Sequence, residues 1–244
     1  DYVKMAAWCA HNVKRHLKIP VAVVTDSKRA ENCPIFDQVI YTEAKDADNS
    51  RYFKDYETHV NWKNTNRIDA YSLTPWEQTL VLDSDYIISS SSLMGLFKAK
   101  QEFLCFKRSL TMNSMSKVSD TTFGDYNFPM WWATVMLFRK GPTAEYIFDS
   151  MNMIRDNWTH YRNIYKNSRG TYRNDHALSI ALGIVNGHTL DHAGIPWSLA
   201  SLTPDHRLTQ LDKDHYRVDF ITSDKKPKWI ELRNQDFHAM GKQQ

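Results

Sequence analysis

The chain has 244 residues, of which 42% are hydrophobic and 13% are aromatic, as in a globular protein with a sizeable core. No run of about 18 apolar residues and no signal peptide is visible, so the sequence predicts neither a membrane span nor export. The net charge of +3 permits a polyanionic partner but does not require one.

The amino-terminal part alternates between predicted helices and strands. Apolar residues recur at helical spacing over 3–17, and Pro20 ends this helix. Short apolar runs predict strands over 21–25 and 36–41, an order that is typical of a nucleotide-binding α/β layer. Residues 43–66 are polar and aromatic without a clear period, so we expect a long loop or an irregular helix there.

An apolar run over 79–82 follows a short predicted helix over 66–73 and ends in two aspartates, Asp83 and Asp85. It predicts a short, fully buried strand of a parallel or mixed sheet, with both aspartates at its carboxyl end. That edge is where ligands bind in open α/β sheets. Two carboxylates one residue apart can reach one hard cation, Mg²⁺ or Mn²⁺, and Ser84 can hydrogen-bond beside them. The alternative interpretation is a polar turn without a ligand.

Two other D-x-D triplets show which feature carries this signal. Residues 46–48 and 212–214 have the same spacing of aspartates, but neither triplet follows an apolar strand. We therefore interpret both as solvated loops. The strand before Asp83, rather than the triplet itself, favours a metal site.

The rest of the chain continues the alternation of helices and strands. Residues 111–127 are rich in Ser, Thr, Asn and Asp, and they predict a flexible connection between two halves. The other predicted elements are a helix over 92–100, strands over 103–106 and 131–138, a long helix after Pro142 that runs to about Tyr165, a helix over 175–185, and strands over 217–221 and 229–232.

The motifs disfavour several common sites and protein classes. The three cysteines, Cys9, Cys33 and Cys105, show no C-x-x-C spacing, which argues against a zinc site or a disulfide framework and favours a reducing, cytoplasmic setting. No G-x-G-x-x-G or G-x-x-x-x-G-K-[ST] occurs, which argues against a Rossmann dehydrogenase and a P-loop NTPase.

Two segments of the second half carry candidate phosphate-binding residues. Basic and aromatic residues interleave over 161–173, as in proteins that bind a phosphate backbone with stacked bases. The alternative interpretation is a solvated helix end without a ligand. The basic residues are Arg162, Lys166, Arg169 and Arg173. Near the carboxyl end, His238 is followed by Gly241 and Lys242, which makes a role with pyrophosphate and metal plausible beside the alternative of an ordinary surface or core histidine.

The block over 67–85 and the opening residues 1–4 resemble the GT-A glycosyltransferases, most closely the glycogenin-like enzymes of glycosyltransferase family 8, which are retaining and metal-dependent. The likeness covers the first 105 residues well, but in the second half it is limited to short, separate segments. It implies an α/β GT-A fold, in which a Rossmann-like nucleotide-binding mixed sheet is flanked by helices. The implied domain is single over 1–244, with a nucleotide-sugar and metal-binding half over 1–110 and a fused acceptor-side half over 111–244.

The resemblance also implies residue roles. Asp83, Asp85 and His238 match the ligands of Mn²⁺ or Mg²⁺, and Asp175 matches an acidic residue beside the reacting sugar. The residues assigned to donor binding are Tyr2, which would stack on uracil, Arg67, Ser84, Asn174 and Lys242, which would hold the diphosphate. The chain departs from the family in lacking its first strand before Tyr2, for which a truncated amino terminus is the simplest explanation, and in lacking its Asn-Ser-Gly strand motif near 132–135.

We therefore expect a metal-dependent transfer of a sugar from a nucleoside diphosphate donor, a UDP-sugar, to an acceptor hydroxyl with retention. The acceptor stays open between a hydroxymethylated DNA base of a phage-type system, a glycan, a lipid-linked sugar and a protein. The alternatives are a nucleotidyltransferase on a related fold and a non-catalytic module that binds sugar nucleotide or nucleic acid. The residues leave open whether Asp175 orients the acceptor, takes its proton, stabilises an oxocarbenium-like centre or only places a charge in a helix turn, and they do not indicate an oligomeric state.

Overall fold

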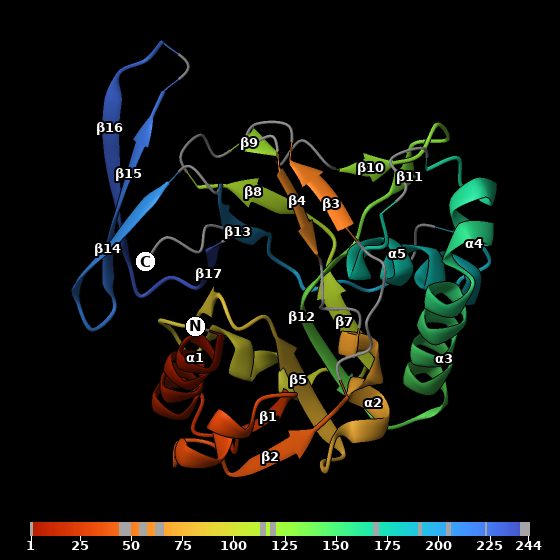
Figure 1. The fold of residues 1–244 in the computed structure, drawn as a ribbon, viewed down its shortest axis with the longest axis horizontal. Helices are drawn as coiled ribbons and strands as arrows, with labels where there is room; N and C mark the ends of the chain where they lie inside the picture. Colours follow the sequence, from red (N-terminus) through yellow and green to blue (C-terminus); the bar gives the residue numbers. More distant parts are fainter. Residues whose placement is uncertain are drawn as a thin grey trace.

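The computed structural model of the chain is a mixed α/β protein with several helices and several sheets, which confirms the predicted α/β class (Figure 1). Within the described residues, none of the helices combines the length and the apolar character that a membrane span needs. The structure describes residues 2–43, 50–53, 58–61, 66–112, 116–117, 121–167, 171–189, 192–203, 206–222 and 224–239.

An antiparallel sheet in the order β5-β12-β7 lies in the middle of the molecule (Figure 1). Its strands are β5 (Gln78–Leu82), β7 (Phe103–Phe106) and β12 (Trp132–Arg139), and all three were predicted. The central strand β12 is buried from Trp132 to Phe138, as expected for a strand with neighbours on both edges and both faces covered. The prediction that β5 is a fully buried strand of a parallel or mixed sheet is wrong. β5 pairs antiparallel with β12 and is only half-buried along its length.

The amino-terminal layer matches its prediction closely. Helix α1 (Tyr2–His16) carries basic residues in its last turn, where they complement the helix dipole, and Lys18, just beyond its end, has a left-handed φ of 56°. After it, β1 (Ala22–Thr25) pairs in parallel with β2 (Gln38–Tyr41), and the short 3-10 helix η1 (Lys28–Asn32) connects them. The predicted helices over 66–73 and 92–100 correspond to η3 (Asn66–Asp69) with α2 (Ala70–Leu73), and to the 3-10 helix η4 (Ser92–Lys98).

The helices of the second half pack against the central sheet. Helix α3 (Pro142–Asp156) begins with proline in its first turn, and the carboxylate of Glu102 accepts hydrogen bonds from the backbone N–H groups of Thr143 and Ala144. Helix α5 (Asn174–Val185) packs between α3 and β12 and is buried on nearly every side. This arrangement explains why its sequence is apolar all round rather than on one stripe.

The predicted single helix up to Tyr165 is wrong, because it divides at Asn157 into α3 and α4 (Trp158–Ile164). The Asn157 side chain donates to the carbonyl of Met153 at 2.9 Å, and the Asn157 backbone N–H bonds the same carbonyl. Asparagine disfavours a helix interior because its side chain competes for backbone groups in this way.

Two segments expected to lack regular structure contain short strands. The predicted loop over 43–66 includes the antiparallel pair β3 (Ser50–Phe53) and β4 (Thr58–Asn61), which is consistent with the high strand propensity of Tyr, Phe, Val and Thr. The predicted flexible connection over 111–127 includes the end of β8 and the short strands β9 and β10. The strands of this region are β8 (Ser109–Thr111), β9 (Ser116–Lys117), β10 (Thr122–Phe123) and β11 (Phe128–Pro129).

The carboxyl-terminal strands form two further sheets. One has the order β6-β17-β13-β8-β9 and joins segments that are distant in sequence, through β6 (Tyr86–Ile87), β13 (Leu199–Leu202) and β17 (Phe237–Ala239). The other is antiparallel and projects at one side of the molecule (Figure 1). Its strands are β14 (Arg207–Asp212), β15 (His215–Ile221) and β16 (Pro227–Arg233), of which the last two were predicted.

Gly124 has both a left-handed backbone and no room for a side chain. Its φ is +67°, and an added Cβ would lie 2.0 Å from the carbonyl oxygen of Tyr165. We expect Gly124→Ala to lower the free energy of unfolding by about 2 to 4 kcal/mol, from the combined cost of left-handed backbone and overpacking. Urea denaturation at constant m value would measure this change.

Gly187→Ala is the matched control for that substitution. Its φ is +60°, but nothing lies within 4 Å of an added Cβ, so only the backbone cost of about 1 kcal/mol applies. Equal destabilisation by the two variants would show that the backbone around Gly124 relaxes away from the contact.

Candidate metal centre

The Asp83–Ser84–Asp85 segment is a tight turn between β5 and β6. The Asp83 N–H donates to the carbonyl of Thr134 in β12 at 3.0 Å, and the Tyr86 N–H donates to the carbonyl of Asp83 at 3.0 Å. The second bond closes a four-residue turn, which contains Ser84 half-buried between the two aspartates. The predicted turn and the predicted pair of carboxylates are therefore the same feature.

Strand pairing brings His238 to this turn. β17 pairs antiparallel with β6, so that His238 lies opposite Tyr86 and the Ala239 N–H donates to the carbonyl of Asp85 at 3.0 Å. The preceding residue, Phe237, is fully buried and packs edge-on against Tyr216 with ring centroids 5.4 Å apart. The imidazole is thus held by main-chain bonds on one side and a buried anchor on the other.

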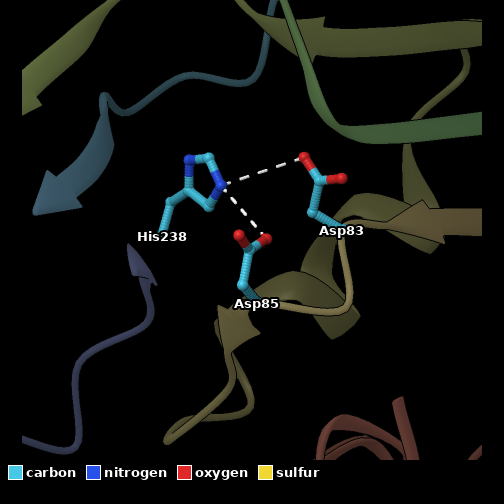
Figure 2. Close-up of side chains that lie close together, drawn as sticks. All are labelled: Asp83, Asp85 and His238. Carbon is cyan, nitrogen blue, oxygen red and sulfur yellow. Dashed lines mark hydrogen bonds and ion pairs between the residues drawn. The ribbon is translucent and has the colours of Figure 1, made fainter. Parts of the chain in front are cut away.

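The three side chains converge on one point (Figure 2). His238 Nε2 lies 3.2 Å from Asp85 Oδ1 and 3.9 Å from Asp83 Oδ2, and one ligand atom from each residue lies within 4.8 Å of the other two. The side chains retain only 13% to 18% of their exposure, so a bound cation would be largely shielded from water. Two carboxylates and a neutral imidazole are a donor set that suits Mn²⁺ and, less strongly, Mg²⁺.

Arg67 holds the other oxygen of Asp83. Its Nη2 forms a close ion pair with Asp83 Oδ1, and its Nη1 donates to the carbonyl of Ala133 at 2.9 Å. Burial lowers the pKa of Arg67, and the charges of Asp175 and Asp85 oppose that effect. The guanidinium stays positive because arginine does not deprotonate in proteins. Asp83 is therefore oriented with Oδ2 toward His238.

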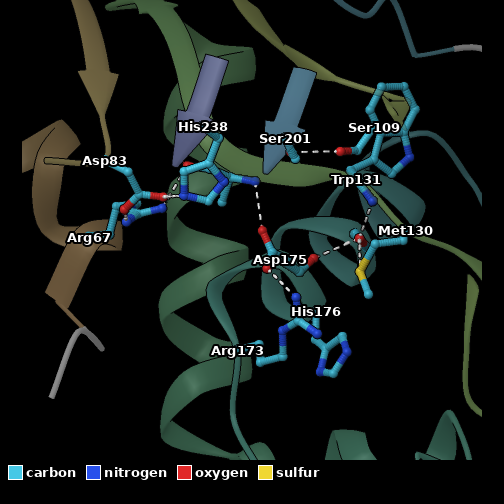
Figure 3. Close-up of polar contacts among 12 residues, drawn as sticks. Arg67, Asp83, Ser109, Met130, Trp131, Arg173, Asp175, His176, Ser201 and His238 are labelled. Carbon is cyan, nitrogen blue, oxygen red and sulfur yellow. Dashed lines mark hydrogen bonds and ion pairs between the residues drawn. The ribbon is translucent and has the colours of Figure 1, made fainter. Parts of the chain in front are cut away.

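Asp175 is a largely buried carboxylate at the start of α5, with 18% of its side chain exposed (Figure 3). Its Oδ1 accepts a hydrogen bond from the Ala133 N–H at 2.9 Å, and its Oδ2 pairs with Arg173 Nη2 at 2.9 Å. Burial raises the pKa of Asp175, but Arg173, the Ala133 N–H and Arg67 together outweigh burial and hold that pKa below its ordinary value. Asp175 is thus ionised at neutral pH and a weak proton acceptor, which favours an electrostatic or orienting role.

The other predicted donor-binding residues are placed less tightly or fall outside the described residues. Tyr2 is exposed at the start of α1, as stacking on a base would require, and Asn174 is buried beside Asp175, where it accepts from the Tyr172 hydroxyl at 3.3 Å. Lys242 lies outside the described residues.

The basic residues over 161–173 do not form one outward-facing set. Arg162 on α4 is half-buried, Lys166 after α4 is exposed, and Arg173 is directed at Asp175. Arg169 lies outside the described residues. The role of Arg173 was missed in the sequence, although its position two residues before Asp175 was an available signal.

The prediction that the two other D-x-D triplets are solvated loops is confirmed only in part. Residues 46–48 lie outside the described residues. Asp212 is exposed, as predicted, but the prediction is wrong for Asp214, whose side chain is only 18% exposed and contacts Arg15 and His16 of α1. The β14–β15 turn is therefore docked against the first helix rather than surrounded by solvent.

The chain matches no known protein-family model and no curated protein. The motif residues and their arrangement in space are therefore the evidence for function.

Proposed function

We propose that the protein is a metal-dependent glycosyltransferase of the GT-A kind, which moves a sugar from a nucleoside diphosphate donor, a UDP-sugar, to an acceptor hydroxyl with retention. The convergence of Asp83, Asp85 and His238 carries this proposal. His238 comes from 153 residues beyond Asp85, yet strand pairing sets its imidazole against the two carboxylates. A solvated polar turn has no need of such a partner.

The residues of the centre have separable roles in this proposal. Asp83, Asp85 and His238 would hold Mn²⁺ or Mg²⁺, which supplies Lewis-acid stabilisation of the charge on a leaving diphosphate. Arg67 keeps Asp83 oriented and adds fixed positive charge next to the centre. Asp175 contributes fixed negative charge, which favours an electron-poor sugar carbon. Tyr2, Ser84, Asn174 and Lys242 are assigned to donor binding by resemblance.

The acceptor is proposed only as a hydroxyl compound. A DNA acceptor drew its support from the basic stretch over 161–173. One of the four basic residues in this stretch, Arg173, is paired with Asp175 and does not contribute to an outward-facing basic surface. The described residues therefore favour DNA no more than a glycan or a protein.

A panel of nucleotide sugars incubated with the protein and Mn²⁺, scored for release of the nucleoside diphosphate, tests the proposal. Release from at least one UDP-sugar is expected, and chelation with EDTA should abolish it until Mn²⁺ is restored. Binding of a UDP-sugar without turnover in Mn²⁺ would instead identify a binding module. Release of pyrophosphate from a nucleoside triphosphate and a sugar phosphate would identify a nucleotidyltransferase.

A further inference from the structure

The guanidinium of Arg67 is directed at a candidate metal ligand. Its Nη2 is ion-paired with Asp83 Oδ1, and its Nη1 donates to the carbonyl of Ala133 at 2.9 Å (Figure 3). Only 10% of the Arg67 side chain is exposed. Two of its nitrogens are therefore engaged inside the protein, one of them with a carboxylate oxygen that could otherwise coordinate a cation.

The backbone of Arg67 is anchored on the outer side of the centre. Arg67 belongs to the 3-10 helix η3, in which the next residue, Ile68, is buried in the main core. Asp69 of the same helix pairs with Arg155 of α3 at 3.0 Å. A core contact and an ion pair thus fix the point from which the Arg67 side chain extends.

The other end of Arg67 is held by an irregular part of β12. The register of β12 against β7 shifts between residues 132 and 136, and the buried carbonyl of Ala133 there accepts from Arg67. The carbonyl of the next residue, Thr134, accepts from the Asp83 N–H at 3.0 Å. The guanidinium and the Asp83 main chain are therefore fixed to adjacent residues of one strand, which holds their side chains in contact.

We propose that Arg67 restricts Asp83 to one metal-binding oxygen, so that the metal centre on which the proposed function rests selects Mn²⁺ or Mg²⁺ against Ca²⁺. Asp83 Oδ2 faces His238, whereas Oδ1 is taken by the guanidinium. Ca²⁺ takes about six to eight oxygen ligands, so it gains from carboxylates that offer both oxygens. Mg²⁺ is smaller and demands a near-octahedral site, in which one oxygen from each carboxylate is enough, and Mn²⁺ is suited to the same ligands.

The ratio of the two affinities separates the position of Arg67 from its charge. Because Mn²⁺ and Ca²⁺ carry the same charge, repulsion by Arg67 weakens the binding of both by similar factors. The nitrogen ligand from His238 disfavours Ca²⁺ in any case, since Ca²⁺ takes oxygen ligands. The contribution of Arg67 is therefore the change in the ratio of the two dissociation constants when this residue is replaced.

Equilibrium binding of Mn²⁺ and Ca²⁺ to the wild type and to Arg67→Met, without nucleotide or sugar, tests the proposal. The electron paramagnetic resonance signal of free Mn²⁺ gives the Mn²⁺ affinity, and displacement of Mn²⁺ by Ca²⁺ gives the ratio. The wild type is expected to favour Mn²⁺. Arg67→Met keeps a long side chain without the charge or the donors, and it should shift the ratio toward Ca²⁺ about tenfold, the scale on which partners of metal ligands act.

Arg173→Met is the matched control for that substitution. Arg173 is likewise a partly buried arginine paired with an aspartate, through Nη2 and Asp175 Oδ2 at 2.9 Å, but Asp175 is not one of the three ligands. The control should leave the ratio of the two dissociation constants unchanged. An equal shift in both variants would mean that the ratio follows the loss of any nearby positive charge, which would overturn the proposal.

Two further results would overturn the proposal and leave the metal centre standing. These are Ca²⁺ binding to the wild type as tightly as Mn²⁺, and a ratio that Arg67→Met does not change. No saturable binding of either ion to the wild type would reject the centre itself, and with it both this proposal and the proposed function. If Arg67→Met unfolds early, its unfolding midpoint with each ion in excess replaces the titration, because tighter binding to the folded state raises the midpoint more. The rise with Ca²⁺ relative to Mn²⁺ should then be larger in the variant than in the wild type, and an equal rise would reject the role of Arg67.

Discussion

Replacement of Asp85 by asparagine is expected to lower Mn²⁺-dependent sugar transfer by a factor of about 10² to 10³. The asparagine keeps the size of the side chain and the main-chain bond from Ala239 to the residue 85 carbonyl, but it removes the negative charge that lies 3.2 Å from His238. Steady-state release of nucleoside diphosphate at saturating donor, measured against Mn²⁺ concentration, would report both the rate and the metal requirement.

Asp85 is a better probe than Asp83 because only Asp83 is ion-paired with Arg67. Removing Asp83 would leave the buried guanidinium without its partner and confuse lost catalysis with lost stability. Asp212→Asn is the matched control, since Asp212 belongs to a D-x-D triplet but is exposed in the β14–β15 hairpin. Full activity of Asp85→Asn with an unchanged Mn²⁺ dependence would reject the metal role of the turn.

The location of this turn could be predicted from the sequence, but the distant residue that completes the site could not be placed by local pattern. An apolar strand followed by two aspartates is a local pattern, and β5 and the turn lie where that pattern indicates. The position of His238 against Asp85 depends on the pairing of β17 with β6 across 153 residues. No local pattern specifies such a partner. The residues that follow His238 indicated a role with pyrophosphate and metal, and the family resemblance assigned it to the same cation as Asp83 and Asp85.

The errors have a common origin in tertiary context. The apolar run of β5 indicated burial on both faces of a parallel or mixed sheet, but β12 pairs with it antiparallel and leaves it half-buried. Asp214 looked solvated because its neighbours in sequence are charged, yet Arg15 and His16 arrive from α1.

Asp175→Asn is expected to lower the free energy of unfolding by about 2 kcal/mol at pH 7, because it removes the negative charge from a largely buried, hydrogen-bonded ion pair. The variant amide can still accept from the Ala133 N–H, but Arg173 loses its ion pair and Arg67 loses a nearby negative charge. Urea denaturation of the wild type and the variant would measure the difference. Asp224→Asn is the control, because the pKa of Asp224 is also lowered, by Thr222 and Lys226, but its side chain is exposed. We expect little change from it.

The pH dependence of the stability difference between wild type and Asp175→Asn separates the contribution of the Asp175 charge from that of its packing. The pKa of Asp175 is lower in the folded protein than the ordinary aspartate value of about 3.9, so its ionised form stabilises the fold above that value. The stabilisation is lost as the pH falls through the folded pKa. The stability difference between wild type and Asp175→Asn should therefore be constant from about pH 5 to 8 and shrink below about pH 4. A difference that persists undiminished at low pH would mean that the asparagine is destabilising through its shape, and that the charge of Asp175 contributes nothing to holding α5 against β12.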